Sequence, residues 1–271
     1  MGGVHSAPAA EIGELLEERV GGVAVLTINR PARRNALIPD VLDGLRDALH
    51  RLEGNPDVRS VVLAGAGGAF SSGADLKSGS LGAKNLLHNH YHPLVTTLLN
   101  LELPVIAALT GVAAGAGASL ALACDFRVAD PRAYFQLSFT KIGLVPDAGL
   151  IWLLPRLVGR ARALELAILA RDLPASEALD WGLVTELSEV DRCVDAAIDF
   201  GGRFDTLSSS VGAVKRAMNE GEAAGLGSYL SYEADLQEQM QKQPDFAEAL
   251  EAFRERRPPR FGPRRHQAAE R

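Results

Sequence analysis

Residues 105–125, with the sequence VIAALTGVAAGAGASLALACD, place a short apolar run directly before a glycine-rich loop and a run of small residues. The apolar run is typical of a buried strand, and the glycines permit a tight turn into a helix expected from about Ala118. The same order occurs earlier, where SVVLA (60–64) is followed by FSSGADL (70–76) and a helix expected at about 81–101. Because strand, glycine loop and helix come twice in succession, the sequence predicts a mixed α/β core of repeating turns.

Further elements are expected on both sides of this repeat. Leu15–Arg19 and Val23–Asn29, joined through Gly21-Gly22, are typical of a β-hairpin. From Pro39 to Gly54 the apolar residues follow a 3.6-residue period, which predicts a helix that covers the sheet. The remaining expected elements are strands at 126–129 and 133–137 and helices at 190–204, 208–220, 228–241 and 246–253.

These elements divide the chain into four predicted parts. Residues 13–204 form the α/β core, and residues 205–262 form a helical region suited to oligomerisation or to a lid. Residues 1–12 are expected to be disordered. The proline- and arginine-rich residues 263–271 are expected to be a mobile tail.

The composition of the 271 residues is that of an ordinary globular protein, with 47% hydrophobic and 23% charged residues. A net charge of −6 argues against nucleic-acid binding, since phosphate neutralisation normally leaves a basic footprint on the domain. Cys124 and Cys193 are far apart and indicate neither a disulfide framework nor a zinc site. Because no apolar run reaches the ~20 residues of a membrane span and no signal peptide is recognised, we expect a cytoplasmic protein without a membrane partner.

The two glycine-rich loops, residues 70–75 and 111–119, are the strongest candidates for chemistry. Glycine has no side chain to block a ligand, so such loops present backbone N–H groups, and a following helix adds the positive end of its dipole. One such loop is explained equally well by a tight strand-to-helix turn, whereas two favour an anion-binding site. A nucleotide site is disfavoured, because Gly115-Ala-Gly117 lacks the third glycine of G-x-G-x-x-G and no G-K-[ST] occurs.

INRPARRNAL (28–37), FSSGADL (70–76), GVAAGAGASLALACD (111–125) and IGLVPDAGLIWLLPRLVGR (142–160) resemble the crotonase superfamily of enoyl-CoA hydratases and isomerases. The resemblance continues to residues 245–261 and so covers nearly the whole chain in order. It implies an α/β spiral of ββα turns with a C-terminal helical region that assembles homotrimers or dimers of trimers. It also implies an acyl-CoA thioester substrate, with coenzyme A as part of the substrate and no separate cofactor or metal.

The resemblance assigns the backbone N–H groups of Ala74 and Ala116 to an oxyanion hole for the thioester oxygen. Loss of one such donor typically costs about 2.7–4 kcal/mol of transition-state stabilisation. The positions that match the family's substrate-binding residues are Arg34, Ala36, Ser72, Gly73, Asp75, Leu76, Gly115, Ser119 and Phe139. Asp75 is expected to fix its loop through its own backbone. Four arginines are equally candidates for coenzyme A phosphate contacts and for solvated surface charge: Arg33, Arg34, Arg256 and Arg257.

The choice of reaction depends on the acid and base. Hydratases of the superfamily use two carboxylates to activate water, and the matching positions here hold Ser119 and Phe139, neither of which is a general base. Asp147 is the remaining candidate. From its local sequence alone, Pro-Asp-x-Gly is better explained as a turn with an aspartate that caps the next helix.

The resemblance reverses that preference. IGLVPDAG and the WLLPR run are similar to the ring-1,2-epoxyphenylacetyl-CoA isomerases and the Δ3-Δ2-enoyl-CoA isomerases, in which this aspartate is the acid/base. Asp147 would remove a proton from C2, the oxyanion hole would hold the dienolate, and Asp147 would return the proton at C4. We expect burial among Phe139, Leu144 and Trp152 to raise the pKa of Asp147. Leu150 and Ile151 replace a Gly-Thr pair of close relatives, which predicts a bulkier pocket.

Three alternatives to isomerase remain open. One is a hydratase, and another is a non-catalytic member that binds acyl-CoA. The third is an aryl-CoA dehalogenase with Asp147 as nucleophile and a histidine near His92, although Phe139 replaces the tryptophan of those enzymes. His88, His90 and His92 alternate but have no neighbouring cysteine or carboxylate in the sequence, so we expect solvated side chains instead of a metal site.

Overall fold

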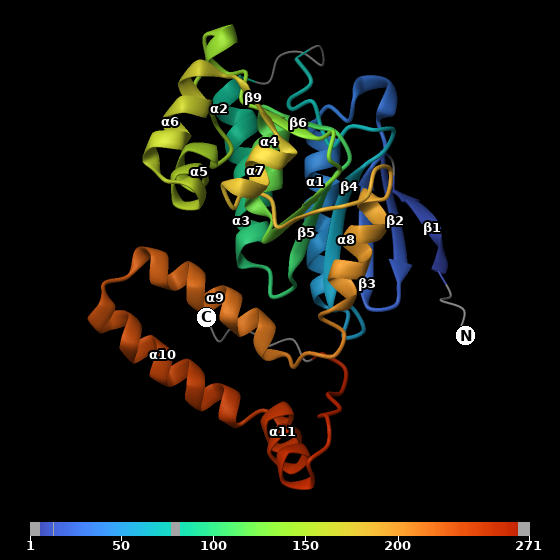
Figure 1. Cartoon of the computed structure of the whole chain (residues 1–271), viewed down its shortest axis with the longest axis vertical. Coiled ribbons are helices and arrows are strands. Elements are labelled where there is room, and N and C mark those ends of the chain that lie inside the picture. Colours follow the sequence, from blue (N-terminus) through green and yellow to red (C-terminus); the bar gives the residue numbers. More distant parts are fainter. Residues whose placement is uncertain (1–5, 13, 77–81, 265–271) are drawn as a thin grey trace.

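The computed structural model describes residues 6–12, 14–76 and 82–264, and its core is a seven-stranded sheet in the order β1-β2-β3-β4-β5-β7-β10 (Figure 1). β1, β2 and β3 are antiparallel neighbours, whereas β3, β4, β5, β7 and β10 run parallel. The strands of this sheet are β1 (Ser6–Ile12), β2 (Leu15–Val20), β3 (Val23–Ile28), β4 (Ser60–Gly65), β5 (Val105–Leu109), β7 (Phe126–Ala129) and β10 (Glu186–Leu187).

A second sheet has three short strands in the order β6-β8-β9. Its strands are β6 (Val112–Ala114), β8 (Tyr134–Gln136) and β9 (Asp172–Pro174). Successive turns of the chain place one strand in the large sheet and the next in the small one before a helix follows, as in β5, β6 and α4 (Ala116–Ala123). Isolated bridges join Leu37 to Ala74 and Ser71 to Ala113, which ties the first glycine loop into the same layer. This arrangement is the predicted ββα spiral.

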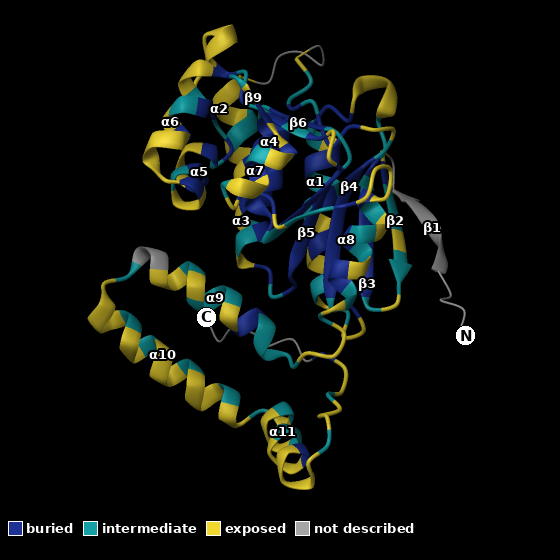
Figure 2. Cartoon of the chain, viewed as in Figure 1, coloured by how far each residue is buried: buried dark blue, intermediate teal, exposed yellow. Residues whose placement is uncertain are grey.

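Side chains of β3 alternate between two packed faces of the large sheet, as a strand period of two requires. Val23 and Val25 pack with α8 (Cys193–Gly202), and Ala24 and Leu26 belong to the main core together with α1 (Pro39–Glu53). Every residue of β4 is buried. Figure 2 accordingly shows buried strands between helices whose outer faces are exposed.

The other core elements are short helices around the ends of the strands. They are the 3₁₀ turns Pro31–Arg33 and Thr140–Ile142 and the helices α5 (Leu150–Val158), α6 (Arg160–Leu169) and α7 (Ala175–Asp180). Within the described ranges, no helix has both the length and the apolar character needed to cross a membrane.

The helix expected at 81–101 is interrupted by a wider turn; residue 81 lies outside the described residues. Its parts are α2 (Ala83–Leu86), a π-helical turn (Leu87–Tyr91) and α3 (His92–Asn100). In the π turn the N–H of His92 donates to the carbonyl of Leu87, five residues earlier. Pro93 explains the widening, because proline has no N–H and its ring clashes with the carbonyl four residues before it.

The C-terminal region extends away from both sheets (Figure 1). It contains α9 (Ser210–Ala223), α10 (Leu226–Gln241) and α11 (Pro244–Glu255). Lys215 of α9 fastens the region to the core, because its Nζ lies 2.7 Å from the carboxylate of Asp125 and donates to the carbonyls of Leu98 and Leu103. The α9 helix is therefore anchored, whereas α10 is exposed along most of its length.

Two expectations about the termini were wrong. Residues 6–12 form a strand instead of a disordered end, because their backbone groups pair with the edge of β2; residues 1–5 lie outside the described residues. Arg264, expected in a mobile tail, is buried. Its N–H donates to the carbonyl of Pro56 and its guanidinium to that of Val58, so the chain returns to the core after α11. Residues 265–271 lie outside the described residues.

Candidate active site

The two glycine loops are in direct contact. The N–H of Ala114 donates to the carbonyl of Ser71 at 2.8 Å, so the loops are joined along their backbones. A Cβ atom placed on Gly73 would lie 2.7 Å from the carbonyl oxygen of Ala114 and 3.2 Å from the nitrogen of Ala116. Gly73 also has a φ of +88°, which disfavours any other residue. Glycine at this position therefore brings the two backbones together.

Ala74 and Ala116 both carry N–H groups without an acceptor among the described residues. The neighbouring N–H groups are used: Asp75 donates to the carbonyl of Leu37 at 3.0 Å, and Gly115 donates to that of Gln136 at 2.9 Å. Ala116 is also the first residue of α4, where the helix dipole favours negative charge. The pair is thus arranged to bind an oxygen that carries developing negative charge.

These two residues line a cavity of about 240 Å³. Its walls come from the first glycine loop, the helical stretch after it, the second loop and the segment after β8. The lining residues are Ser72, Gly73, Ala74, Leu76, Ala83, Leu86, Leu87, Tyr91, Ala114, Gly115, Ala116, Gln136, Ser138, Phe139, Ile142, Leu144 and Asp147. Asp147 is the only carboxylate among the described residues of this wall.

Asp147 is half-buried, and its main chain is held by its neighbours. The hydroxyl of Ser119 donates to the Asp147 carbonyl at 3.0 Å, and the N–H of Leu150 donates to the same carbonyl at 3.0 Å. No side-chain capping bond is made to α5, so the alternative of a capping aspartate is wrong. Burial raises the pKa of the Asp147 carboxyl, and the nearby His92 opposes the rise.

Five of the predicted substrate-binding residues lie in the cavity wall and four do not. Those in the wall are Ser72, Gly73, Leu76, Gly115 and Phe139. Ser119 is fully buried and serves the main chain of Asp147. Asp75 forms an ion pair with Arg30 at 3.2 Å, so it ties its loop to the segment after β3. Ala36 is buried beside that segment and its carbonyl accepts from Arg30, while Arg34 lines a separate surface hollow.

Two further expectations need correction. Trp152 does not bury Asp147, because its side chain is 44% exposed and stacks under the guanidinium of Arg156. Leu150 points into the core and Ile151 into solvent, so neither makes the cavity bulkier. The positions of these three side chains follow from the direction in which α5 leaves the turn that contains Asp147.

The arginines and histidines outside the cavity also take definite positions. Arg257 was a candidate for contact with the coenzyme A phosphates. In the structure its guanidinium instead forms an ion pair with Glu248 at 2.6 Å. His90 pairs with Asp43 at 2.9 Å instead of being solvated. The rings of His88 and His92 meet edge to face, and the described residues contain no group of three or more potential metal ligands.

Tyr91 is one of the cavity residues that the sequence analysis did not single out. It is the last residue of the π turn, is only 4% exposed and lines the same wall as Asp147. Pro93 was the available signal, since a proline near the start of a helical segment is compatible with a widened turn.

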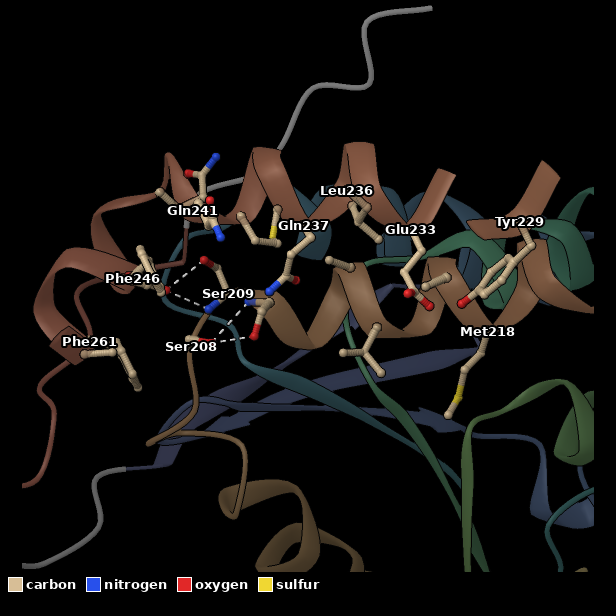
Figure 3. A pocket seen from close by; sticks show the side chains of 18 residues that line it. Ser208, Ser209, Met218, Tyr229, Glu233, Leu236, Gln237, Gln241, Phe246 and Phe261 are labelled. Atoms are coloured by element: carbon tan, nitrogen blue, oxygen red, sulfur yellow. Dashed lines mark hydrogen bonds between the residues drawn. The ribbon is translucent and has the colours of Figure 1, made fainter. Parts of the chain in front are cut away.

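A second hollow, of about 520 Å³, lies between α9, α10 and α11 (Figure 3). Apolar side chains of Met218, Leu236 and Phe246 contribute to its lining. At one end the N–H and hydroxyl of Ser209 donate to the carboxylate of Asp245 at 2.7 and 2.8 Å. This bond joins the first turns of α9 and α11, and the rest of the hollow resembles a packing face.

The fold and the cavity together define the crotonase class, in which two loops of a ββα spiral direct free N–H groups toward one catalytic pocket. The chain belongs to the enoyl-CoA hydratase/isomerase family, whose model matches residues 18–264. A solved structure of an enoyl-CoA hydratase from Polaromonas sp. JS666 has a TM-score of 0.87 and 32% identity, covering 92% of this chain and all of that one (100%).

Similar curated proteins have different reaction names. A Rhodobacter capsulatus protein named probable enoyl-CoA hydratase is 43% identical over 249 residues, covering 89% of this chain and 94% of the relative. The Escherichia coli 1,2-epoxyphenylacetyl-CoA isomerase is 38% identical, with coverages of 89% and 95%. An Arthrobacter 4-chlorobenzoyl coenzyme A dehalogenase is 33% identical, with coverages of 88% and 89%. The names of the relatives therefore do not decide which reaction this chain catalyses, and that question has to be argued from the residues of the site.

Proposed function

We propose that the chain is an acyl-CoA enzyme that shifts a carbon–carbon double bond, as enoyl-CoA isomerases do. One observation carries the proposal: among the described residues of the cavity wall, a single carboxylate accompanies the two free N–H groups. Migration of a double bond needs one group that removes a proton and returns it, whereas hydration needs a positioned water as well.

The proposed reaction has three steps. The thioester oxygen accepts from the N–H groups of Ala74 and Ala116, which makes the C2 proton of a 3-enoyl group acidic. Asp147 removes that proton, and the electrons move into a dienolate whose negative oxygen stays at the two N–H groups. Asp147 then returns the proton at C4, which leaves the conjugated 2-enoyl product. No external proton, metal or further cofactor is required, and coenzyme A enters only as part of the substrate.

The positions of the two missing carboxylates support isomerase over hydratase. The Ser119 hydroxyl is buried and already donates to the carbonyl of Asp147, so it holds the acid/base instead of a water. Phe139 adds an apolar ring to the wall. Compared with the hydratases, Ser119 and Phe139 each replace a carboxylate that acts as acid or base. The two N–H groups of the proposed oxyanion hole are unaffected by these replacements.

The raised pKa of Asp147 fits the same role. A carboxylate with an ordinary pKa is a weak base, whereas burial brings the proton affinity of Asp147 closer to that needed for the α-proton of a thioester. The carboxylate must be ionised to act, so activity should fall as the pH drops through the raised pKa.

Ultraviolet absorbance tests the proposal directly. With 3-hexenoyl-CoA, the wild-type protein should form the absorbing conjugated thioester. With 2-hexenoyl-CoA, loss of absorbance by hydration should be slower by about two orders of magnitude or more, since an acid/base contributes 10²–10⁴-fold. Fast hydration with slow isomerisation would establish the hydratase alternative, and inertness toward both would favour the other family activities or a binding role.

A second candidate function is favoured by His92. Its imidazole lies close enough to Asp147 to oppose the rise of the pKa of that carboxyl, and a dehalogenase is among the relatives. In that reaction Asp147 would attack the ring carbon that carries the halogen. Release of chloride from 4-chlorobenzoyl-CoA would support this candidate, whereas its absence beside active isomerisation would exclude it.

We also propose a homotrimer or a dimer of trimers. The support is apolar surface that one chain leaves exposed, on α5 and α6 and in the hollow of the C-terminal region (Figure 3). The exposed apolar residues of α5 and α6 include Ile151, Trp152, Ile168 and Leu169. Light scattering that gives the mass of one chain at micromolar concentration would contradict this part of the proposal.

A further inference from the structure

The hydroxyl of Tyr91 is buried and has no hydrogen-bond partner among the described residues. The side chain is only 4% exposed, so the hydroxyl is shielded from bulk solvent. Buried tyrosine hydroxyls normally find a partner, and an unpaired one is destabilising. The lone hydroxyl therefore indicates that an acceptor is supplied by something other than the described residues.

The position of Tyr91 indicates what supplies it. The residue lines the same cavity as Ala74, Ala116 and Asp147, so its side chain borders the place that an acyl group would occupy. Its nearer surroundings are apolar, with Leu87 in the same π turn. Burial and the neighbouring Asp147 carboxylate raise the pKa of Tyr91, so the phenol keeps its proton and acts as a donor.

Asp147 is not the missing acceptor. It is present in the chain and close enough to influence Tyr91 electrostatically, yet no hydrogen bond joins the two side chains. A resident carboxylate that served as the partner would already be bonded in the free protein. The acceptor therefore lies outside the described residues, and the cavity that Tyr91 lines is where a ligand would bring it.

We infer that Tyr91 is a specificity-determining residue that donates to an oxygen atom on the acyl group, beyond the thioester. This inference rests on the proposed function in taking the cavity as the acyl site and the N–H groups of Ala74 and Ala116 as the donors to the thioester oxygen. The thioester oxygen already has two donors in Ala74 and Ala116, so the Tyr91 hydroxyl serves a different oxygen. The preferred ligands are then acyl-CoA thioesters with an oxo, hydroxyl or ether oxygen in the chain, in preference to plain hydrocarbon acyl groups.

The discrimination should be measurable because pairing the hydroxyl removes a cost that the free protein already carries. A plain acyl group would cover the Tyr91 hydroxyl without pairing it, whereas an oxygenated one would satisfy it. Sites built to hydrogen-bond a polar ligand atom reject the analogue that lacks it much more strongly than apolar pockets distinguish a methylene. A buried unpaired hydroxyl corresponds to a preference of about tenfold or more.

Equilibrium binding to the full chain tests the inference without any turnover. The ligands are hexanoyl-CoA, 4-oxohexanoyl-CoA and 5-oxohexanoyl-CoA, which are similar in size and lack a carbon–carbon double bond. The wild type should bind at least one oxo ligand about tenfold more tightly than hexanoyl-CoA. Tyr91→Phe should abolish that preference and leave the dissociation constant of hexanoyl-CoA unchanged or slightly lower.

Two controls separate this role from a structural one. Tyr134→Phe removes a tyrosine hydroxyl outside the cavity and should keep the wild-type preference. Without ligand, Tyr91→Phe should melt at or above the wild-type temperature, because it removes an unpaired buried hydroxyl. Should this variant fail to fold, the wild-type comparison of the three ligands decides alone.

Three outcomes would overturn the inference: equal wild-type affinity for oxo and plain ligands, a preference that survives in Tyr91→Phe, or an equal loss of affinity for every ligand. The last would assign the hydroxyl to the thioester that all ligands share. Because binding requires no double-bond migration, these outcomes are independent of the isomerase assay. A protein that binds oxo ligands selectively but does not isomerise 3-hexenoyl-CoA would refute the proposed function alone.

Discussion

Substitution of Gly73 by alanine should disable the oxyanion hole with little change to the rest of the fold. The added Cβ would lie 2.7 Å from the carbonyl oxygen of Ala114, a backbone atom that cannot rotate away. Relief requires the two loops to separate. Since Ala74 directly follows Gly73, its N–H would move relative to that of Ala116, and the two donors would no longer share one acceptor.

The expected effect of Gly73→Ala has two parts, a loss of stability and a loss of kcat. A φ of +88° costs alanine about 1–2 kcal/mol in the folded state, which lowers stability but not the rate of the reaction step. Loss of one donor from an oxyanion hole costs about 2.7–4 kcal/mol in the transition state, or 10²–10³ in kcat. We therefore expect Gly73→Ala to fold with a lower melting temperature and to lose at least a hundredfold in kcat.

Gly68→Ala is the matched control. Gly68 has a similar φ of +79°, but a Cβ there would meet no atom within 4 Å. It should lose comparable stability and keep the wild-type kcat in the 3-hexenoyl-CoA assay. The reasoning is refuted if Gly73→Ala retains kcat within threefold of the wild type, or if both variants lose activity equally.

Three other substitutions test the surroundings. Ser119→Ala removes the bond that holds the carbonyl of Asp147, so kcat should fall about tenfold while KM changes little; unchanged kinetics would deny the positioning role. Lys215→Ala removes the ammonium group beside the part-buried Asp125 carboxylate and should cost about 3–5 kcal/mol in urea unfolding, whereas the exposed Lys242→Ala should cost less than about 1 kcal/mol. Burial raises the folded-state pKa of Asp147 above 3.8, so the ionised carboxylate destabilises the fold as pH rises through that pKa. Asp147→Asn should consequently raise the melting temperature at pH 7 and not at pH 3, and a lower melting temperature at pH 7 would contradict this.

Local sequence predicted the parts of the site that depend on backbone conformation. Gly73 and Gly115 both have positive φ, and this need is visible in the sequence because few other residues adopt it. The strands before the loops were equally predictable, since β4 and β5 are buried throughout and read as continuous apolar runs. The mixed α/β spiral follows from these repeated units.

Side-chain surroundings were less predictable because they depend on helix directions. Trp152 lies only five residues after Asp147, yet the turn into α5 directs it to solvent. Ser119 and Asp147 are 28 residues apart, and their contact exists only because α4 passes behind the turn. Tyr91 enters the cavity from a π turn, which a 3.6-residue period does not anticipate.

The central claim is that one carboxylate transfers the proton. The most direct measurement is the rate at which Asp147→Asn converts 3-hexenoyl-CoA to the conjugated product, compared with wild type and with the exposed control Asp180→Asn. We predict a loss of 10²–10⁴ in kcat for Asp147→Asn, with retained acyl-CoA binding and full activity in Asp180→Asn. Isomerisation by Asp147→Asn at more than a tenth of the wild-type rate would contradict the account.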